Sequence, residues 1–380
     1  MAEGRGGRTD AQPGDAVPLV DRPVLQLLGP STGGIRRHVA ALTLALRDRG
    51  WRVATAGPAG VLDGLGVDLD HVVPVPGGSD VRRAAAALTA LRNVAADARL
   101  VHAHGLRAGW LAALVRPRRP VVVTVHNLVL DEAAGRSAAV LRRLEGVLPG
   151  RVDAVIAVSH GIADRFADAP PGRVTIIRPL GPPPHPQRTP AEVRDRLGVP
   201  PGAPLVVCVA RLHPQKGLTT LVDASALLRD LVPGVCVAVV GAGPDEQALR
   251  GRIARLGLAG TVLLAGASPN APDELAAADT VVCSSVWESG PLAVAEALAL
   301  GRPVVSTPVG FVPELVVDGW SGRLVSVGSA DALADAVAAV LTEPETAAGY
   351  GEHGRARVTD VLGPDRLVAA VEAVYRQVLR

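Results

Sequence analysis

Short apolar runs alternate with amphipathic stretches along the chain from Val24 onward. Apolar runs of about four to eight residues are typical of buried strands, and apolar positions three and four apart are typical of helices. The first half of the chain predicts strands at Val24–Leu28, Val53–Ala56, Leu100–His102, Val121–Val125, Ala154–Val158 and Val174–Ile177. The helical pattern is clearest at Ile35–Arg49 and Val81–Asp97. This alternation predicts a parallel sheet with helices on both faces.

The alternation stops at one proline-rich segment and then resumes. Residues 178–190 contain six prolines, and because proline fixes φ and lacks a backbone donor, we expect a semi-rigid linker there. The second half predicts strands at Leu205–Ala210, Val235–Val240, Val262–Ala265, Thr280–Cys283 and Pro303–Thr307. The last stretch, Asp365–Arg380, has the pattern of an amphipathic helix.

The fold class that follows is α/β, with two facing Rossmann-like domains, each built on a doubly wound parallel sheet. We expect the first domain at residues 21–180, a proline-rich linker at 181–200, the second domain at 201–357 and a C-terminal helix at 358–380. Ligands of such sheets bind beyond the carboxyl ends of the strands, so the cleft between the domains is the expected site.

Composition narrows the class of protein. Apolar residues make up 48% of the 380 positions, which excludes a disordered chain, and a net charge of +2 is too balanced for a dedicated nucleic-acid binder. Residues 1–20 lack the apolar stretch of a secretory signal, so we expect a disordered tail. Since no apolar run approaches the roughly 20 residues that span a bilayer, we expect a cytoplasmic protein.

The basic residues are unevenly distributed. Only one of the 39 is a lysine, Lys216, and a lone lysine in an arginine-rich chain indicates a position where arginine will not serve. Residues 1–180 carry 23 Arg against 16 acidic residues, a net +7, and residues 181–380 carry 16 basic against 21 acidic residues, a net −5. This asymmetry either marks the half that meets an anionic partner or is chance scatter of surface charge.

The three cysteines indicate no metal site. Cys208, Cys236 and Cys283 lie far apart in apolar runs and fit no metal-ligand spacing. We therefore expect buried structural thiols in a reducing compartment.

A pair of cations follows the expected strand Leu205–Ala210. Arg211 and Lys216 are five residues apart in the segment RLHPQKG. At the carboxyl end of a strand, the planar fork of an arginine and the point charge of a lysine together suit a diphosphate. An exposed basic loop is the alternative, but the single lysine of the chain falls here.

A pair of carboxylates lies further along, in the segment WESGPLAVAE. We expect a helix at about Pro291–Leu300, because proline suits a helix start and a glycine follows its end. Glu288 then lies in the loop before the helix and Glu296 on its second turn, while free backbone N–H groups of Ser289–Leu292 point to the same place. Carboxylates accept hydrogen bonds from sugar and ribose hydroxyls; two surface glutamates are the alternative.

Glycines mark two further candidate positions. Gly33 and Gly34 end the segment GPSTGG and open the helix that follows the first expected strand. There, adjacent glycines let a ligand approach the backbone amides, and the helix dipole favours an anion. A plain strand–helix turn is equally compatible, because neither a P-loop nor a dinucleotide fingerprint is complete. Gly266, after another expected strand, is a candidate for close approach of a nucleotide base to the backbone.

Histidines end two neighbouring strands of the first domain. His126 follows the strand Val121–Val125 and is placed to hydrogen-bond a sugar hydroxyl or a developing charge, or else to play a structural role. His102 and His104 end the adjacent strand in the segment VHAHG. Their spacing is compatible with metal ligands, but no third ligand is evident, so we expect no metal and place both on the acceptor side of the cleft.

Taken in order, these segments resemble a retaining glycosyltransferase of family 4 (glycosyl transferases group 1) with the GT-B fold. The resemblance extends from Val24 to the C-terminal helix. It is carried by GPSTGGIRRHVAALTLALRDRGW, VHAHG, VVVTVHN, AVSHGIADR, ARLHPQKGLTTLVDA, VVGAGPDEQALR, ELAAADTVVCSS and WESGPLAVAEALALGRPVVSTPVG. The two glutamates separated by seven residues, preceded by the Arg–Lys pair, are its most specific part.

The resemblance implies a hexosyltransferase that moves a sugar from a UDP- or GDP-linked donor to an acceptor hydroxyl, with retained configuration and without metal. Arg211 and Lys216 would bind the diphosphate, and Glu288 would bind the donor sugar. Glu296 would bind the ribose, and His126 would lie beside the sugar at the reacting centre. The remaining donor-binding positions would be Gly33, Gly34, Gly266, Ser289, Gly290 and Leu292. The last helix would cross back onto the first domain.

Two positions depart from the family pattern. Where the family often has Asn-Gly after the strand that ends at Ile177, this chain has Arg178 and Pro179, from which we expect an altered hinge. Where the family often has two glycines, this chain has Gly310 and Phe311, and Phe311 is expected to narrow the donor pocket.

Two other functions remain open. A phosphorylase of the same fold would need Lys216 as the Schiff-base lysine of pyridoxal phosphate, and we expect no such cofactor. A catalytically inactive cytoplasmic protein that binds a nucleotide sugar would carry the same motifs.

The acceptor is only hinted at by charge. The basic first half suggests a lipid-linked or cell-envelope glycan precursor and peripheral contact with the inner face of an anionic membrane. The arginines that could make this contact, unless they are simply solvated, are Arg116, Arg118, Arg119, Arg142 and Arg143.

Overall fold

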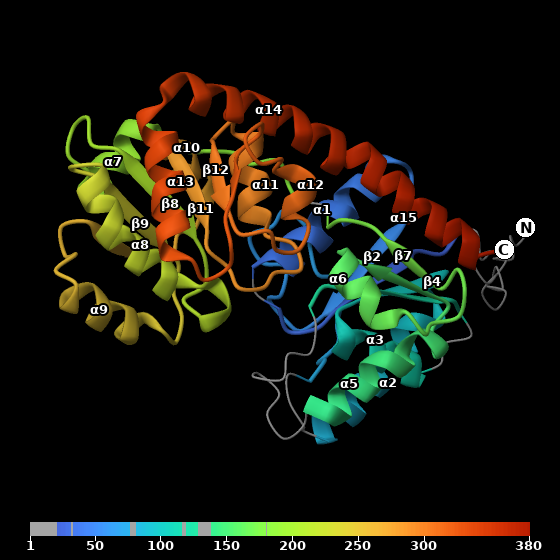
Figure 1. Ribbon diagram of the computed structural model, residues 1–380. Coiled ribbons are helices and arrows are strands. Elements are labelled where there is room, and N and C mark those ends of the chain that lie inside the picture. Colours follow the sequence, from blue (N-terminus) through green and yellow to red (C-terminus); the bar gives the residue numbers. More distant parts are fainter. Residues whose placement is uncertain (1–20, 32, 77–80, 116–118, 128–137, 180) are drawn as a thin grey trace, which may run out of the picture.

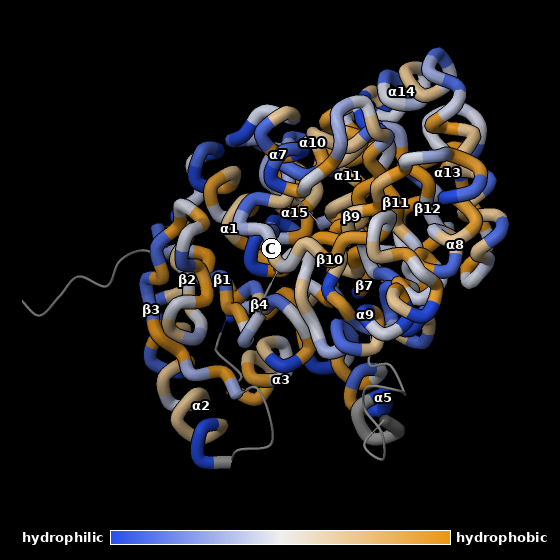
Figure 2. Tube along the Cα trace, turned by 90° about the vertical axis from the view of Figure 1, so that its left-hand side faces the viewer, coloured by the Kyte–Doolittle hydropathy of each residue, from blue (hydrophilic) through white to orange (hydrophobic). Residues whose placement is uncertain are grey.

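The computed structural model describes residues 21–380 except residues 32, 77–80, 116–118, 128–137 and 180, and it leaves the side chains of residues 81 and 138–141 undescribed. The predicted disordered tail, residues 1–20, lies outside these residues. The described chain forms two domains, each a parallel sheet covered by helices (Figure 1). The central strands of both sheets are apolar and buried (Figure 2).

The first domain contains a seven-stranded sheet in the order β3-β2-β1-β4-β5-β6-β7. All of its strand pairs are parallel. Its strands are β1 (Val24–Leu28), β2 (Val53–Gly57), β3 (His71–Val72), β4 (Leu100–His104), β5 (Val121–Val125), β6 (Ala154–Ala157) and β7 (Val174–Ile176). Its α-helices are α1 (Gly34–Asp48), α2 (Val81–Ala96), α3 (Leu106–Val115), α5 (Ala138–Val147) and α6 (His160–Ala163).

The second domain contains a six-stranded parallel sheet in the order β10-β9-β8-β11-β12-β13. Its strands are β8 (Leu205–Val209), β9 (Cys236–Val240), β10 (Val262–Gly266), β11 (Thr280–Cys283), β12 (Val304–Ser306) and β13 (Arg323–Leu324). Its helices are α7 (Pro190–Leu197), the 3₁₀ turn η5 (Pro214–Lys216), α8 (Leu218–Leu231), α9 (Glu246–Arg255), α10 (Ala271–Ala277), α11 (Leu292–Ala299), α12 (Val312–Leu315), α13 (Ala330–Thr342) and α14 (Pro344–Leu362).

The predicted linker is shorter than residues 181–200, because its second half forms helix α7. Thr189 and Glu192 form a capping box at the start of this helix, Pro190 occupies its first turn, and Gly198 ends it in the left-handed conformation. Val193 anchors the helix in the core of the second domain. The prediction of a linker over residues 190–197 is therefore wrong. Pro190 was read as a sign of a linker, but proline in the first turn favours a helix.

A helix does cross back onto the first domain, but it begins at residue 364 rather than 358. Helix α14 packs on α11 and α12 of the second domain. The helix is interrupted at Gly363, and α15 (Pro364–Val378) continues along the same side of the molecule onto the first domain (Figure 1). Leu367, Val371 and Tyr375 of α15 are buried against the first sheet and α1.

Polar contacts with Arg49 and Trp51 hold α15 on the first domain. The Trp51 indole donates a hydrogen bond of 2.8 Å to Glu372, and the Arg49 guanidinium contacts both Glu372 and Asp365. Burial alone would raise the pKa of Glu372, but the hydrogen bonds from Trp51 and Arg49 outweigh it and hold that pKa below 4.5. The two domains are therefore joined both by the linker and by α15.

The three cysteines are free thiols; Cys208 is buried, and Cys236 and Cys283 are half-buried. Among the described helices, none is both long enough and apolar enough to cross a membrane.

Candidate functional site

The loops that follow β8 and β11 are joined at the carboxyl edge of the second sheet. The two strands are neighbours in that sheet. The backbone N–H of Val286 donates to the carbonyl of Gln215 at 2.8 Å, and the Gln215 side chain donates to the carbonyl of Trp287 at 2.9 Å. These bonds hold the Arg211–Lys216 segment against the loop that carries Glu288, as a preorganised site requires.

Gly217 makes this close approach possible. Its φ is +59°, and a Cβ at this position would lie 2.1 Å from the carbonyl oxygen of Ser284. The Ser284 hydroxyl in turn donates to the carbonyl of Lys216 at 3.0 Å. Only glycine combines the left-handed conformation with this contact.

The sequence-predicted Lys216 and Glu288 form an ion pair at this edge. Their side chains are 19% and 9% exposed, and the Ser285 hydroxyl donates to the same Glu288 oxygen at 2.8 Å. Arg211 lies five residues before Lys216 in the same loop and is exposed. Within the described part of the chain, no ion pair of Arg211 is observed. The edge therefore presents one free guanidinium and one lysine that already neutralises a carboxylate.

Phe311 does not narrow this site, contrary to the expectation from the sequence. Its side chain is fully buried in the second core. A Cβ at Gly290 would lie 2.2 Å from the Phe311 ring, and a Cβ at Gly310, whose φ is +59°, would lie 2.9 Å from the carbonyl of Ser289. Phe311 thus supports the Ser289–Gly290 backbone from the inside of the domain.

Glu296 lies where the two domains meet. The helix predicted around it is observed as α11, which begins at Leu292, one residue later than expected. Glu296 is 7% exposed and forms an ion pair with Arg37 of α1, a residue that the sequence did not single out. The Oε1 atom of Glu296 is the one that faces the Arg37 guanidinium. Burial raises the pKa of this carboxyl, against the opposing effect of Arg37.

The N-termini of α1 and α11 approach one another beside this pair. Gly34 opens α1, and a Cβ there would lie 3.2 Å from the side chain of Leu292. Gly33 precedes it with a φ of +72°. Gly266 ends β10 with a φ of +74° and has open space around its Cβ position. Gly34 therefore faces the second domain, whereas Gly266 lies two strands away from β8.

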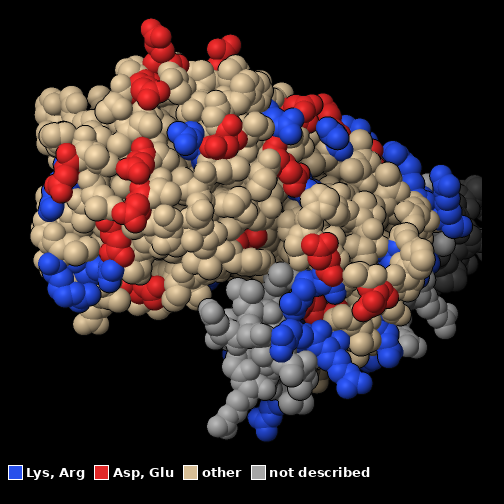
Figure 3. All heavy atoms as spheres, in the orientation of Figure 1, with Lys and Arg blue, Asp and Glu red and all other residues tan. Residues whose placement is uncertain are grey.

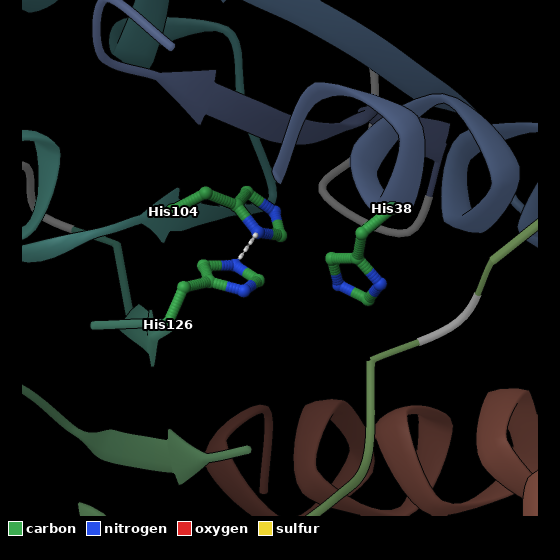
Figure 4. A group of neighbouring side chains, drawn as sticks. All are labelled: His38, His104 and His126. Carbon is green, nitrogen blue, oxygen red and sulfur yellow. Dashed lines mark hydrogen bonds between the residues drawn. The ribbon is translucent and has the colours of Figure 1, made fainter. Parts of the chain in front are cut away.

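His126 belongs to a buried group of three histidines (Figure 4). His126 follows β5, His104 ends β4, and His38 extends from α1. The Nδ1 atom of His104 lies 3.3 Å from Nε2 of His126, and one ring nitrogen of each histidine lies within 4.8 Å of the others. His38 is thus the third possible metal ligand that the sequence analysis did not find. Helical spacing could have indicated His38, since it lies one turn after Gly34 on the same helix.

Two of these imidazoles, those of His104 and His126, are held in the neutral form. Burial, and then the neighbouring imidazoles, place the pKa values of His104 and His126 well below the usual 6.5. Neutral rings are the form that binds a metal ion, but they are also the form that makes imidazole–imidazole hydrogen bonds.

His102 is not on an acceptor surface, so that prediction is wrong. It has no exposed area and lies between the Tyr375 hydroxyl, at 2.6 Å, and the Thr124 hydroxyl, at 2.7 Å. His104 is 3% exposed and contacts Gln26 and His126 rather than the surface. Residues two apart on a strand share a face, and here that face is covered by Tyr375 of α15 at His102 and by His38 of α1 at His104.

Arg178, at the first departure from the family pattern, joins the two domains. Its Nε donates to Oε2 of Glu314 in α12 at 2.8 Å, and its Nη2 donates to the other carboxylate oxygen. Arg178 is 8% exposed and Glu314 is 32% exposed. An asparagine could not make this two-pronged contact, so the hinge of this chain has an ion pair of its own.

Comparison with known proteins gives matches over both domains. The family model described as Glycosyl transferases group 1 matches residues 191–357, and the model described as Glycosyltransferase Family 4 matches residues 32–179. The chain is 33% identical to the lipopolysaccharide core biosynthesis mannosyltransferase LpsB of Rhizobium meliloti (strain 1021), over 60% of this chain and 67% of LpsB. It is 32% identical to the alpha-maltose-1-phosphate synthase of Mycobacterium tuberculosis (strain ATCC 25618 / H37Rv), over 76% of this chain and 81% of the synthase.

Solved structures share the fold. The crystal structure of Anabaena Alr3699/HepE in complex with UDP and glucose matches with a TM-score of 0.80 at 22% identity, over 93% of this chain and 100% of that chain. A sucrose-phosphate synthase from Thermosynechococcus elongatus matches with a TM-score of 0.77 at 23% identity, over 94% of this chain and 99% of that chain.

The two facing parallel-sheet domains and these matches define a GT-B glycosyltransferase that uses a nucleotide sugar. The chain belongs to glycosyltransferase family 4.

Proposed function

We propose that this chain is a retaining hexosyltransferase that needs no metal and takes its sugar from a UDP- or GDP-linked donor. The observation that carries the proposal is the Lys216–Glu288 pair beside Arg211 at the carboxyl edge of β8. Two cations are available there for the two phosphates of a donor, and a carboxylate is available for the hydroxyls of its sugar.

The two cations stabilise the leaving group of the reaction. Breaking the bond to the anomeric carbon leaves positive charge on the sugar and negative charge on the diphosphate. Arg211 and Lys216 stabilise the diphosphate from fixed positions, which lowers the barrier without reorganisation of water. When Lys216 turns to the phosphates, Glu288 is released from its ion pair and accepts hydrogen bonds from the sugar, while Ser285 keeps it oriented.

The ribose would bind at Glu296. The two oxygens of a carboxylate accept several hydrogen bonds, so Glu296 can accept from ribose hydroxyls while it stays beside Arg37. Because Arg37 belongs to the first domain, ribose binding at Glu296 would change a contact between the two domains. In this arrangement the departing phosphate takes the proton of the acceptor hydroxyl on the same face, which retains the configuration.

Binding of nucleotide sugars tests the donor class. Calorimetric titration with a panel of UDP- and GDP-linked hexoses should give saturable binding of one of them, which Glu296→Gln weakens at least tenfold. Arg250→Ala is the control, because Arg250 is 61% exposed and, among the described residues, pairs with Glu246 of its own helix α9. Binding that is unchanged in Glu296→Gln would refute the ribose assignment.

Turnover then separates the enzyme from an inactive binding protein. Transfer with the cognate donor should continue in excess EDTA and give a product with the anomeric configuration of the donor, as read by proton NMR. Loss of transfer in EDTA would refute the metal-independent mechanism, an inverted product would refute retention, and binding without sugar release or transfer would support the inactive protein.

The acceptor side is proposed to face an anionic membrane and a lipid-linked acceptor. Arg142 and Arg143 are exposed on α5 beside Leu144 and Val147, which are 41% and 43% exposed. Figure 3 shows basic side chains gathered on this part of the first domain. Arg116 and Arg118 lie outside the described residues. The variant R142A/R143A should reduce sedimentation with anionic vesicles; equal sedimentation of wild type with anionic and neutral vesicles would refute the contact.

A further inference from the structure

A continuous chain of buried polar side chains leads from α15 to His126. Gln26 on β1 stands in its middle, with its carbonyl oxygen 2.5 Å from Nε2 of His104 and its amide nitrogen 3.1 Å from the Tyr375 hydroxyl. On one side, Nδ1 of His104 lies 3.3 Å from Nε2 of His126. On the other side, the Tyr375 hydroxyl lies 2.6 Å from Nδ1 of His102. None of these side chains is more than 5% exposed.

The orientation of the Gln26 amide determines where the protons lie. Its carbonyl oxygen can only accept, so His104 must donate from Nε2 and carry its proton there. A neutral imidazole has one proton, so Nδ1 of His104 is an acceptor, and His126 donates to it from Nε2. Nδ1 of His126 is then left without a proton and is itself an acceptor. The chain of hydrogen bonds thus fixes which atom of His126 can receive one.

The other half of the chain is consistent with this direction. The amide of Gln26 donates to the Tyr375 oxygen, the Tyr375 hydroxyl donates to Nδ1 of His102, and Nε2 of His102 donates to the Thr124 hydroxyl, 2.7 Å away. Burial lowers the pKa of His102 to about 3. Each ring therefore stays neutral near neutral pH and has a single proton to place.

The same side chains could hold the opposite set of protons if the Gln26 amide turned over. Gln26 would then donate to Nε2 of His104, His104 would donate from Nδ1 to His126, and Nδ1 of His126 would carry a proton. Tyr375 bears on this choice because its oxygen accepts the Gln26 N–H group. Without that hydroxyl the observed orientation would leave a buried N–H unpaired, whereas the reversed one would leave only a carbonyl oxygen unpaired, which proteins tolerate better.

We propose that Tyr375 is a positioning residue for the transfer reaction, which holds His126 through Gln26 and His104 as the Nε2–H tautomer with Nδ1 free to accept a hydrogen bond from a hydroxyl of the donor sugar. The part of this assignment that concerns the sugar rests on the proposed function, which places His126 beside the donor. The tautomer itself does not, and it can be measured in the free enzyme.

The test is the tautomer of His126, read from the 15N chemical shifts of its two ring nitrogens in protein labelled at histidine. His126→Asn identifies the signals. In the wild type, Nε2 should be the protonated nitrogen and Nδ1 the unprotonated one; in Tyr375→Phe this assignment should reverse. Val374→Ala is the matched control, since Val374 is buried on α15 next to Tyr375 but has no polar group. It should loosen α15 without moving the His126 signals.

Activity provides the second measurement. Tyr375→Phe keeps the ring and should lower kcat about tenfold, as expected for loss of one hydrogen bond to a neutral group, and Val374→Ala should not. A wild-type His126 protonated on Nδ1, or signals that do not move in Tyr375→Phe, would overturn the proposal. So would one equivalent of bound zinc whose removal shifts the His126 signals, because the three histidines would then be a metal site. If no donor supports turnover, the proposed function fails while the tautomer result still stands or falls by itself.

Discussion

Lowering the pH from about 7.5 to about 5.5 should destabilise the first domain through its buried histidines. His102, His104 and His126 have their pKa values lowered in the folded protein, first by burial and then by neighbouring imidazoles, His38 among them. In the unfolded chain each would titrate near 6.5. Above that pH neither state binds a proton, so the free energy of unfolding is unaffected. Below that pH the imidazoles bind protons in the unfolded chain but not in the folded domain, so the free energy of unfolding falls.

The size of the effect follows from the number of rings. One pH unit below the unfolded pKa, each neutral imidazole costs about 1.4 kcal/mol of stability, so three together cost about 4 kcal/mol. That is a large part of a typical free energy of unfolding of about 5–15 kcal/mol. Carboxylates with lowered pKa values, such as Glu372, lose their contribution only as the pH falls through a value below 4.5. The raised pKa of Glu296 acts in the opposite direction, but it is one group.

Urea unfolding of the full chain at about pH 7.5, 6.5 and 5.5, followed by circular dichroism, measures this slope. The samples contain a chelator, since protonation of metal ligands would produce a similar loss. The free energy of unfolding should be nearly constant above pH 6.5 and fall steeply below it. Equal values at about pH 7.5 and 5.5 would show that the cluster titrates in the folded state, and the reasoning from its burial would be refuted.

Two further predictions concern glycine and charge at the domain junction. Gly202→Ala should destabilise the second domain by about 1–2 kcal/mol, and Gly217→Ala should destabilise it by clearly more. Both glycines have positive φ, but only the Gly217 Cβ would meet a carbonyl oxygen. Equal losses in chemical denaturation would contradict this. Arg178→Ala should cost about 1.5–3 kcal/mol, the range for hydrogen bonds to a charged group. The loss should shrink in the double variant R178A/E314A, because Glu314 is then no longer unpaired. Calorimetry checks this, and a double variant that is no more stable than R178A would count against the pair.

Most of the fold could be predicted because buried parallel strands are short apolar runs. Val121–Val125 and Thr280–Cys283 were predicted with their observed bounds. β3 was missed, since its two exposed residues, His71 and Val72, form no such run. Helix α7 was missed for another reason, because its first residue is a proline in a proline-rich segment and Val193 is its single buried residue.

That Lys216 and Glu288 lie at the same edge of the sheet could be predicted although the two residues are 72 positions apart. Lys216 and Glu288 are each at the end of a strand, and parallel strands bring such ends to one edge. Arg37 and His38 could not be found in this way. Both lie on α1, and which face of α1 meets the second domain depends on how the domains pack, as the contact of Arg37 with Glu296 shows.

The first-domain histidines show a second limit. A strand pattern gives the shared face of His102 and His104 but not what covers that face. The cover comes from Tyr375, which is 273 residues away from His102 in sequence. Phe311 was misplaced for the same reason, since only the packed structure shows Gly290 directly against its ring.

The central claim is that Arg211 and Lys216 stabilise the diphosphate as the sugar leaves. The most direct measurement is the rate of nucleoside diphosphate release during sugar transfer with saturating cognate donor, in the wild type, Lys216→Ala and the surface control Arg250→Ala. The account predicts normal release in the control and a kcat lower by about 30- to 1,000-fold in Lys216→Ala, which corresponds to roughly 2–4 kcal/mol of lost transition-state stabilisation. Near-normal turnover in Lys216→Ala would contradict it.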